Sequence, residues 1–164
     1  MHESPSVRRA KVITVSDGVV AGTREDRSGA AVAARLVEDG WQVVERIVVE
    51  DGVEPVAAAL REAASNFSGL LVTTGGTGFA PRDLTPEGTR SVLEREAPGL
   101  AEAMRTADPA KGRLSRGMAG MLGRCIVLNT PGSTAGAVES VDAVLDVLPH
   151  ALALLAEVPT RHPS

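Results

Sequence analysis

The chain has 164 residues, of which 43% are hydrophobic, 23% charged and 2% aromatic, and its net charge is −4. This size and composition favour one globular domain with a core of its own. The negative charge and the scarcity of aromatic rings argue against a nucleic-acid partner, which needs positive charge and stacking surfaces. No apolar run is long enough to span a membrane or to form a signal peptide, so we expect a cytoplasmic protein.

The first half of the chain alternates short aliphatic runs with stretches in which small apolar residues recur at helical spacing. Such alternation predicts βαβ units and a mostly parallel sheet. A helix before Gly40 has two candidate capping residues, Asp26 and Ser28. Strands are expected at 11–16, 41–49 and 69–75, and helices at 30–40 and 55–65.

The second half is richer in helical patterns. Thr85-Pro86-Glu87 is typical of a helix start, with a hydroxyl as the cap and proline in the first turn. We expect this helix to run to about Glu96 and to be broken by Pro98-Gly99. Further elements are expected at 100–107 (a helix), at 121–129 (the last strand) and after residue 135 (two helices hinged near Pro149).

No internal repeat and no linker divides the chain. We therefore expect a single α/β domain over residues 11–158, with flexible tails at 1–10 and 159–164. The single cysteine, Cys125, lies in an apolar run, where a buried structural thiol is a better interpretation than a reactive one.

Polar or glycine-rich loops follow the expected strands. In open parallel sheets, ligands bind at the carboxyl ends of the strands, where such loops meet helix starts. If the loops converge, they form one site. The loops span residues 16–29, 51–52, 75–83 and 129–134.

The loop GGTG at 75–78 matches neither common phosphate-binding motif. No lysine follows Gly78, as a Walker loop requires, and Pro81 stands where a dinucleotide fingerprint has its third glycine. Glycines nevertheless let backbone N–H groups approach an anion, and a helix start at Thr85 adds a favourable dipole. The alternative is a plain turn after a strand. We predict a phosphate site.

Two aspartates flank this loop in the expected fold. Asp51 follows the second strand and Asp83 precedes the helix at Thr85. If neighbouring parallel strands bring them together, they form a pair of carboxylates suited to Mg²⁺ that is shared with substrate phosphates. The alternative for each aspartate is helix capping.

Five motifs together carry a family resemblance: TVSDG (14–18), DRSG (26–29), TTGGTGFAPRDLTPE (73–87), LSRG (114–117) and NTPGS (129–133). In this order and spacing they resemble the molybdopterin adenylyltransferases of the MogA/MoaB type, whose domain also occurs in gephyrin. The resemblance extends from Lys11 to about Val158. It implies a molybdopterin-binding-type fold, a three-layer αβα sandwich around a mostly parallel sheet.

The resemblance also implies a nucleotidyltransferase reaction of molybdenum cofactor biosynthesis. The phosphate of molybdopterin attacks the α-phosphorus of Mg-ATP, pyrophosphate leaves, and adenylyl-molybdopterin goes on to molybdate insertion. Asp51 and Asp83 match the acidic residues held essential for this transfer, as catalytic residues and as metal ligands. It further implies a homotrimer or higher homo-oligomer, with a molybdate-inserting enzyme as a possible partner.

The remaining contacts follow from the same comparison. Residues implied to contact ATP are Gly75, Gly76, Thr77, Gly78, Asn129, Pro131, Gly132 and Ser133. Residues implied to contact molybdopterin are Ser16, Asp17, Ser115 and Arg116, although Arg116 also fits a solvated surface arginine.

One residue departs from the family pattern. The family usually reads P-G-S-P where this chain has Thr134 after Ser133, and we expect the threonine to free the backbone or to cap the following helix. This departure leaves open a non-catalytic molybdopterin-binding relative. A third alternative is a nucleotide pyrophosphatase of the kind that shares this domain in competence-damage proteins.

Overall fold

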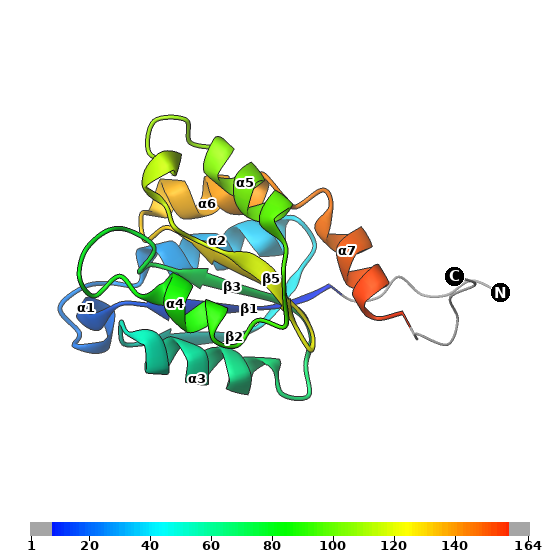
Figure 1. Cartoon of the computed structure of the whole chain (residues 1–164), viewed down its shortest axis with the longest axis horizontal. Coiled ribbons are helices and arrows are strands. Elements are labelled where there is room, and N and C mark those ends of the chain that lie inside the picture. Colours follow the sequence, from blue (N-terminus) through cyan, green and yellow to red (C-terminus); the bar gives the residue numbers. More distant parts are fainter. Residues whose placement is uncertain (1–7, 158–164) are drawn as a thin grey trace.

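A six-stranded sheet forms the centre of the protein in a computed structural model that describes residues 8–157 (Figure 1). The strand order is β2-β1-β3-β6-β5-β4. The β2, β1, β3 and β6 strands are parallel, whereas β5 and β4 are antiparallel to their neighbours. The strands are β1 (Arg9–Val15), β2 (Gln42–Val49), β3 (Ser68–Thr74), β4 (Arg95–Glu96), β5 (Ala119–Leu122) and β6 (Arg124–Thr130).

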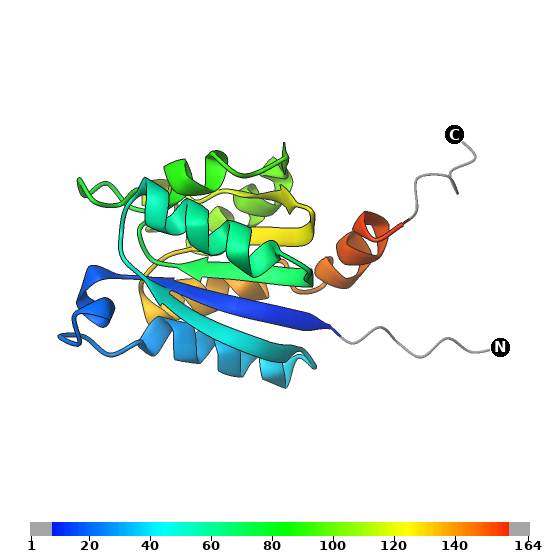
Figure 2. The same ribbon diagram turned by 90° about the horizontal axis from the view of Figure 1, so that it is seen from below.

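Helices cover both faces of this sheet, so the predicted three-layer αβα sandwich is confirmed (Figures 1 and 2). Helices α2, α5, α6 and the start of α7 pack on one face, and α3 with α4 beside it lies on the other. The helices are α1 (Asp17–Val20), α2 (Arg27–Glu38), α3 (Val53–Ala64), α4 (Thr85–Arg90), α5 (Pro98–Thr106), α6 (Thr134–Asp142) and α7 (Leu148–Leu155), with a 3-10 turn η1 (Gly112–Leu114).

Alternating side chains of the central strands supply two hydrophobic cores. In β1, Val12 faces the α2 side whereas Ile13 faces the α3 side, and both are fully buried. Leu70 and Leu71 divide in the same way in β3. Both faces of these strands are therefore covered, which explains their nearly continuous apolar sequence.

Two element predictions are wrong. The expected strand at 121–129 is a hairpin, because Gly123 adopts a positive φ of 59° and turns the chain between β5 and β6. The expected helix from Thr85 to Glu96 ends at Arg90, and Arg95–Glu96 forms the short edge strand β4. Pro98 does not break a helix but opens α5, where its missing N–H has no cost.

The start of the domain also differs from the prediction. Strand β1 begins at Arg9, and Ala10 is fully buried, so the domain begins before residue 11. The rest of the predicted tails, residues 1–7 and 159–164, lies outside the described residues. Within residues 8–157 the longest helices have 12 residues, and none has the length and apolar character to cross a membrane.

Cys125 is buried, as predicted, and its thiol donates to the carbonyl oxygen of Phe67 at 3.3 Å. Burial raises the pKa of this thiol. We expect a maleimide at pH 8 to label the native protein at least about a hundredfold more slowly than the denatured chain, since reaction requires opening of the core. Mass spectrometry over time measures both rates; equal rates would contradict the burial.

Candidate functional site

The carboxyl ends of β1, β2, β3 and β6 meet at one edge of the sheet, near α1 in Figure 1. A cavity of about 910 Å³ opens there. All four predicted loops line it, together with the segment from α5 to η1. Its volume lies at the upper end of the range for small-molecule sites.

Glycine is required at the first two positions of the GGTG loop. Gly75 and Gly76 have φ values of +100° and +69°, which disfavour any side chain. A Cβ atom on Gly75 would collide with the carbonyl oxygen of Val15, and one on Gly76 would collide with Oγ1 of Thr85. The prediction that Thr85 caps α4 is wrong. Its hydroxyl donates to the carbonyl of Gly75 at 2.9 Å, and its N–H donates to the carbonyl of Gly76 at 3.1 Å.

Arg116 occupies the next two carbonyl groups of the loop. Its backbone N–H donates to the carbonyl of Thr77 at 2.9 Å, and its Nε donates to that of Gly78 at 2.9 Å. Together with Thr85, Arg116 therefore bonds all four carbonyl oxygens of residues 75–78.

The amide N–H groups of the loop, unlike its carbonyl groups, are mostly without a hydrogen-bond partner among residues 8–157. The N–H of Gly75 donates to Thr130 in β6 at 3.0 Å, so it is not free for a phosphate. No acceptor among residues 8–157 bonds the N–H of Gly76, Thr77 or Gly78. A loop with occupied carbonyls and unbonded amides is suited to an anion.

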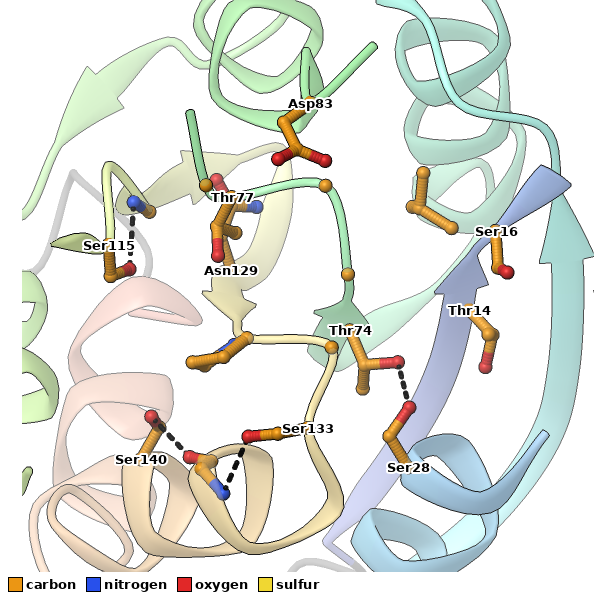
Figure 3. Close-up of a pocket in the computed structure, with 18 of the residues that line it drawn as sticks. Thr14, Ser16, Ser28, Thr74, Thr77, Asp83, Ser115, Asn129, Ser133 and Ser140 are labelled. Atoms are coloured by element: carbon orange, nitrogen blue, oxygen red, sulfur yellow. Dashed lines mark hydrogen bonds between the residues drawn. The ribbon is translucent and has the colours of Figure 1, made fainter. Parts of the chain in front are cut away.

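Both predicted acidic residues line this cavity. The expectation that the strands before these two residues are neighbours is wrong, because β1 lies between β2 and β3. Even so, Oδ1 of Asp51 lies 3.2 Å from the position that a Cβ would take on Gly76, and Oδ2 of Asp83 lies 2.9 Å from that position on Gly78. The carboxylate of Asp83 points toward the loop that carries Thr77 (Figure 3).

Burial raises the pKa of the Asp51 carboxyl above the usual value of 3.8, and the negative charges of Asp17 and Asp83 act in the same direction. The folded protein therefore binds the Asp51 proton more tightly than the unfolded chain. An ionised Asp51 therefore destabilises the metal-free fold. This loss of stability develops as the pH rises through and above 3.8, the ordinary pKa of the carboxyl group.

We expect Asp51→Asn to be more stable than the wild type in metal-free buffer near pH 7, with a smaller advantage near pH 4. The amide oxygen of asparagine retains the hydrogen bond that Asp51 Oδ2 accepts from the N–H of Asp17. Thermal unfolding of both proteins in a chelator across this pH range measures the difference. A difference in Tm that is constant with pH would contradict the prediction.

The two aspartates fit a magnesium ion shared with substrate. Within the described chain, Oδ1 of Asp51 and Oδ1 of Asp83 accept no hydrogen bond, whereas Oδ2 of each accepts one from a backbone N–H. No group of three or more His, Cys, Asp or Glu residues gathers among residues 8–157 to hold a metal. Mg²⁺ commonly binds one or two carboxylates and completes its shell with phosphate oxygens and water.

The predicted molybdopterin residues of the first loop have different positions. Ser16 lines the cavity and caps α1, accepting from the N–H of Val19 at 3.2 Å. Asp17 does not line the cavity; its carboxylate pairs with Arg82, which donates at 2.6 and 3.2 Å. The hydrogen bond from Arg82 lowers the pKa of Asp17.

The LSRG segment divides in a similar way. Ser115 lines the cavity, and its hydroxyl accepts from the N–H of Gly117 at 3.2 Å (Figure 3). The guanidinium of Arg116 lies outside the lining and, besides Gly78, bonds the carbonyl of Asp83 at 2.5 Å and Glu87 at 2.6 Å. Arg116 thus fixes the 77–83 loop through contacts of a guanidinium that lies outside the cavity lining.

Asn129 lies in the wall of the cavity, yet its amide is used by the protein. Its Nδ2 donates to Thr73 and Thr89, both at 3.0 Å, and its Oδ1 accepts from the N–H of Met118 at 3.0 Å. Because the side chain is buried and fully bonded, it holds β6 to the neighbouring segments.

The last loop approaches the glycine loop closely. Pro131, Gly132 and Ser133 line the cavity, and a Cβ on Gly132 would lie 3.4 Å from the Cα of Gly75. Ser133, not Thr134, caps α6, accepting from the N–H of Gly136 at 3.2 Å. Thr134 occupies the first helical position, where proline is favoured in helices generally and threonine adds an N–H at the cavity.

Several lining residues were not predicted from the sequence. Their hydroxyl or charged groups belong to the β1 end, the loop that leads into α2, the end of β3, helix α6, and α5 with the segment after it. Spacing gives no signal for the last group, because only the folded chain brings residues 101–115 over the sheet edge. The additional polar residues of the lining are Thr14, Thr23, Arg24, Glu25, Arg27, Thr74, Arg105, Asp108, Lys111, Thr134 and Ser140.

Comparison with known proteins finds relatives of similar sequence over most of this chain. A family described as a probable molybdopterin binding domain matches residues 11–150. A protein of Helicobacter pylori named molybdopterin adenylyltransferase is 33% identical over 150 residues, covering 88% of this chain and 85% of the relative. A molybdenum cofactor biosynthesis bifunctional protein of Synechococcus elongatus is 36% identical over 149 residues. The chain spans 22–48% of the length of four such longer relatives.

Solved structures give the same result for the fold. A MogA structure superposes with a TM-score of 0.86 at 39% identity and covers 91% of this chain and 100% of its own. MoaB of Thermus thermophilus, described as a molybdopterin biosynthesis enzyme, superposes with a TM-score of 0.85 at 44% identity, covering 93% and 99%. The family match at 11–150 includes the glycine loop and the last loop, and the backbone agreement covers more than nine-tenths of the chain; the chain belongs to the molybdopterin binding domain family.

Proposed function

We propose that this chain is a molybdopterin adenylyltransferase of molybdenum cofactor biosynthesis. An oxygen of the molybdopterin phosphate forms a bond to the α-phosphorus of ATP, and the bond from that phosphorus to the bridging oxygen breaks. The products are adenylyl-molybdopterin and pyrophosphate. Relatives named for this activity, at 33–40% identity, support the assignment.

One observation carries the proposal: the carboxylates of Asp51 and Asp83 and the unbonded amides of residues 76–78 line a single cavity. Attacking and leaving groups in this reaction are both anionic. Catalysis therefore depends on positioning them and on neutralising their charge, which amides and a carboxylate-held cation do.

The chain's own groups divide this work. The N–H groups of Gly76, Thr77 and Gly78 bind phosphate oxygens, and the start of α6, capped by Ser133 in the same lining, adds its dipole. Asp51 and Asp83 hold Mg²⁺, which supplies positive charge on the phosphates when it is bound. Arg24, Arg105 and Lys111 in the lining provide further positive charge for anionic substrates.

A turnover assay with purified molybdopterin, ATP and MgCl₂ tests the proposal. Pyrophosphate and adenylyl-molybdopterin are expected to appear in equal amounts. Pyrophosphate released from ATP without molybdopterin would instead indicate a nucleotide pyrophosphatase. Binding of both compounds by calorimetry without any product would indicate a non-catalytic relative.

The assembly and surroundings of the protein follow from the same assignment. We propose a cytoplasmic homotrimer that passes its product to a molybdate-inserting enzyme. Exposed apolar side chains at Val37, Val147 and Leu154 are compatible with contacts between copies. Sedimentation equilibrium at several concentrations tests the trimer.

A further inference from the structure

We propose that Arg82 is a positioning residue: it ties the loop that carries Asp83 to the two turns that carry Asp17 and Asp51, and so sets the relation of the two catalytic carboxylates. The inference rests on the proposed function for its catalytic consequence. Its structural part depends only on contacts within this chain.

The turns after β1 and β2 are joined to each other by a reciprocal pair of hydrogen bonds. The N–H of Asp17 donates to Oδ2 of Asp51 at 3.0 Å, and the N–H of Asp51 donates to Oδ1 of Asp17 at 3.1 Å. The β1 and β2 strands are also neighbours in the sheet. Asp51 is therefore fixed relative to the β1 end.

Asp83 belongs to a different unit. Its loop leaves β3 on the other side of β1, so nothing in the pairing of β2 sets its position. Arg82 crosses this gap: Nε and Nη2 donate to Asp17 at 2.6 and 3.2 Å, and Nη2 also donates to the carbonyl of Asp51 at 3.1 Å. Among residues 8–157, no other hydrogen bond joins the 76–84 loop to either turn.

The chemistry of arginine suits this task. A planar guanidinium bonds a carboxylate through two parallel N–H groups and so defines an orientation, which the single ammonium of lysine does not. The side chain of Arg82 is 64% exposed, and an exposed ion pair adds little to global stability. This contact therefore contributes mainly local order next to Asp83. Displacement of the Asp83 carboxylate by a fraction of an ångström would impair catalysis.

The closing experiment compares Arg82→Gln, Arg82→Lys and Asp17→Asn with a matched control, Arg61→Gln. Arg61 is an exposed arginine of α3 outside the cavity lining, so its change removes the same charge elsewhere. We expect Arg82→Gln to lower kcat by at least about tenfold while KM for ATP changes by less than about threefold. Arg82→Lys restores part of kcat, and Arg61→Gln matches the wild type.

The second measurement needs no turnover. In ligand-free protein, hydrogen exchange at the amides of Asp17, Asp51 and residues 79, 80, 82 and 83 is expected to quicken in Arg82→Gln and Asp17→Asn, whereas exchange in β3 and the Tm stay at wild-type values. Unchanged exchange and kcat in Arg82→Gln would overturn the inference. So would a loss that lysine does not restore and that accompanies a lower Tm.

The two proposals fail separately. A wild-type chain that makes no adenylyl-molybdopterin overturns the proposed function and, with it, the catalytic role of Arg82. Faster exchange confined to these turns would still establish Arg82 as the link between them.

Discussion

Asp83→Asn is expected to lower the rate of pyrophosphate release by at least about a hundredfold, because it removes one of the two charges that steer the metal ion and the phosphates. Asparagine keeps an oxygen for the N–H of Ala80, which now donates to Oδ2 of Asp83 at 3.0 Å. The loop and the Tm are therefore expected to stay close to the wild type. Pyrophosphate release coupled to a colorimetric phosphate assay measures the rate.

The matched control for this change is Asp146→Asn. Asp146 is an exposed carboxylate between α6 and α7 and lies outside the cavity lining, so its loss is expected to leave the rate unchanged. Wild-type activity in Asp83→Asn would remove the carboxylate pair from the mechanism. A folded but inactive protein supports it.

Gly76→Ala is expected to impair both folding and nucleotide binding. At φ +69° an alanine is strained, and its Cβ would collide with Oγ1 of Thr85. Strain of this kind costs about 1–3 kcal/mol, and relief of the collision moves the N–H groups of the loop. We expect a lower Tm and at least about a tenfold loss of ATP affinity, equivalent to about 1.4 kcal/mol, in calorimetric titration.

Gly99→Ala serves as the control for a methyl group added to glycine. Gly99 lies in the first turn of α5, and apart from its chain neighbours and the backbone of its own helix no heavy atom of residues 8–157 lies within 4 Å of the position that its Cβ would take. This change is expected to preserve ATP affinity and to leave stability equal or slightly higher. If Gly76→Ala bound ATP as well as Gly99→Ala does, the glycine loop would not be the phosphate site.

The parallel strands are predictable as runs rich in aliphatic residues. In β1, β3 and β6 helices bury these runs on both faces, whereas the edge strand β2 is mostly exposed. Two of the errors lie where one glycine or proline has two possible roles. The sequence pattern predicts that Gly123 is part of a strand, although it makes the hairpin turn, and that Pro98 breaks a helix, although it begins α5. Periodicity does not distinguish these roles; the partner strand and the core do.

For the site, the sequence predicted which loops converge but not how their side chains are used. Asp17 is in an expected loop and Arg116 is in the LSRG motif, yet both bond protein groups and lie outside the cavity lining. The partner of each comes from a distant part of the chain: Arg82 for Asp17 and Glu87 for Arg116. A motif gives the residue type at such a position, and only tertiary contacts decide whether its charge faces ligand or protein.

The occupied carbonyl groups of residues 75–78 have a consequence for how the protein meets its ligand. Because Thr85 and Arg116 already fix each peptide plane, the loop is organised before any nucleotide arrives. The entropy of ordering this segment is lost when the chain folds and not when it binds, which leaves more of each new contact as affinity.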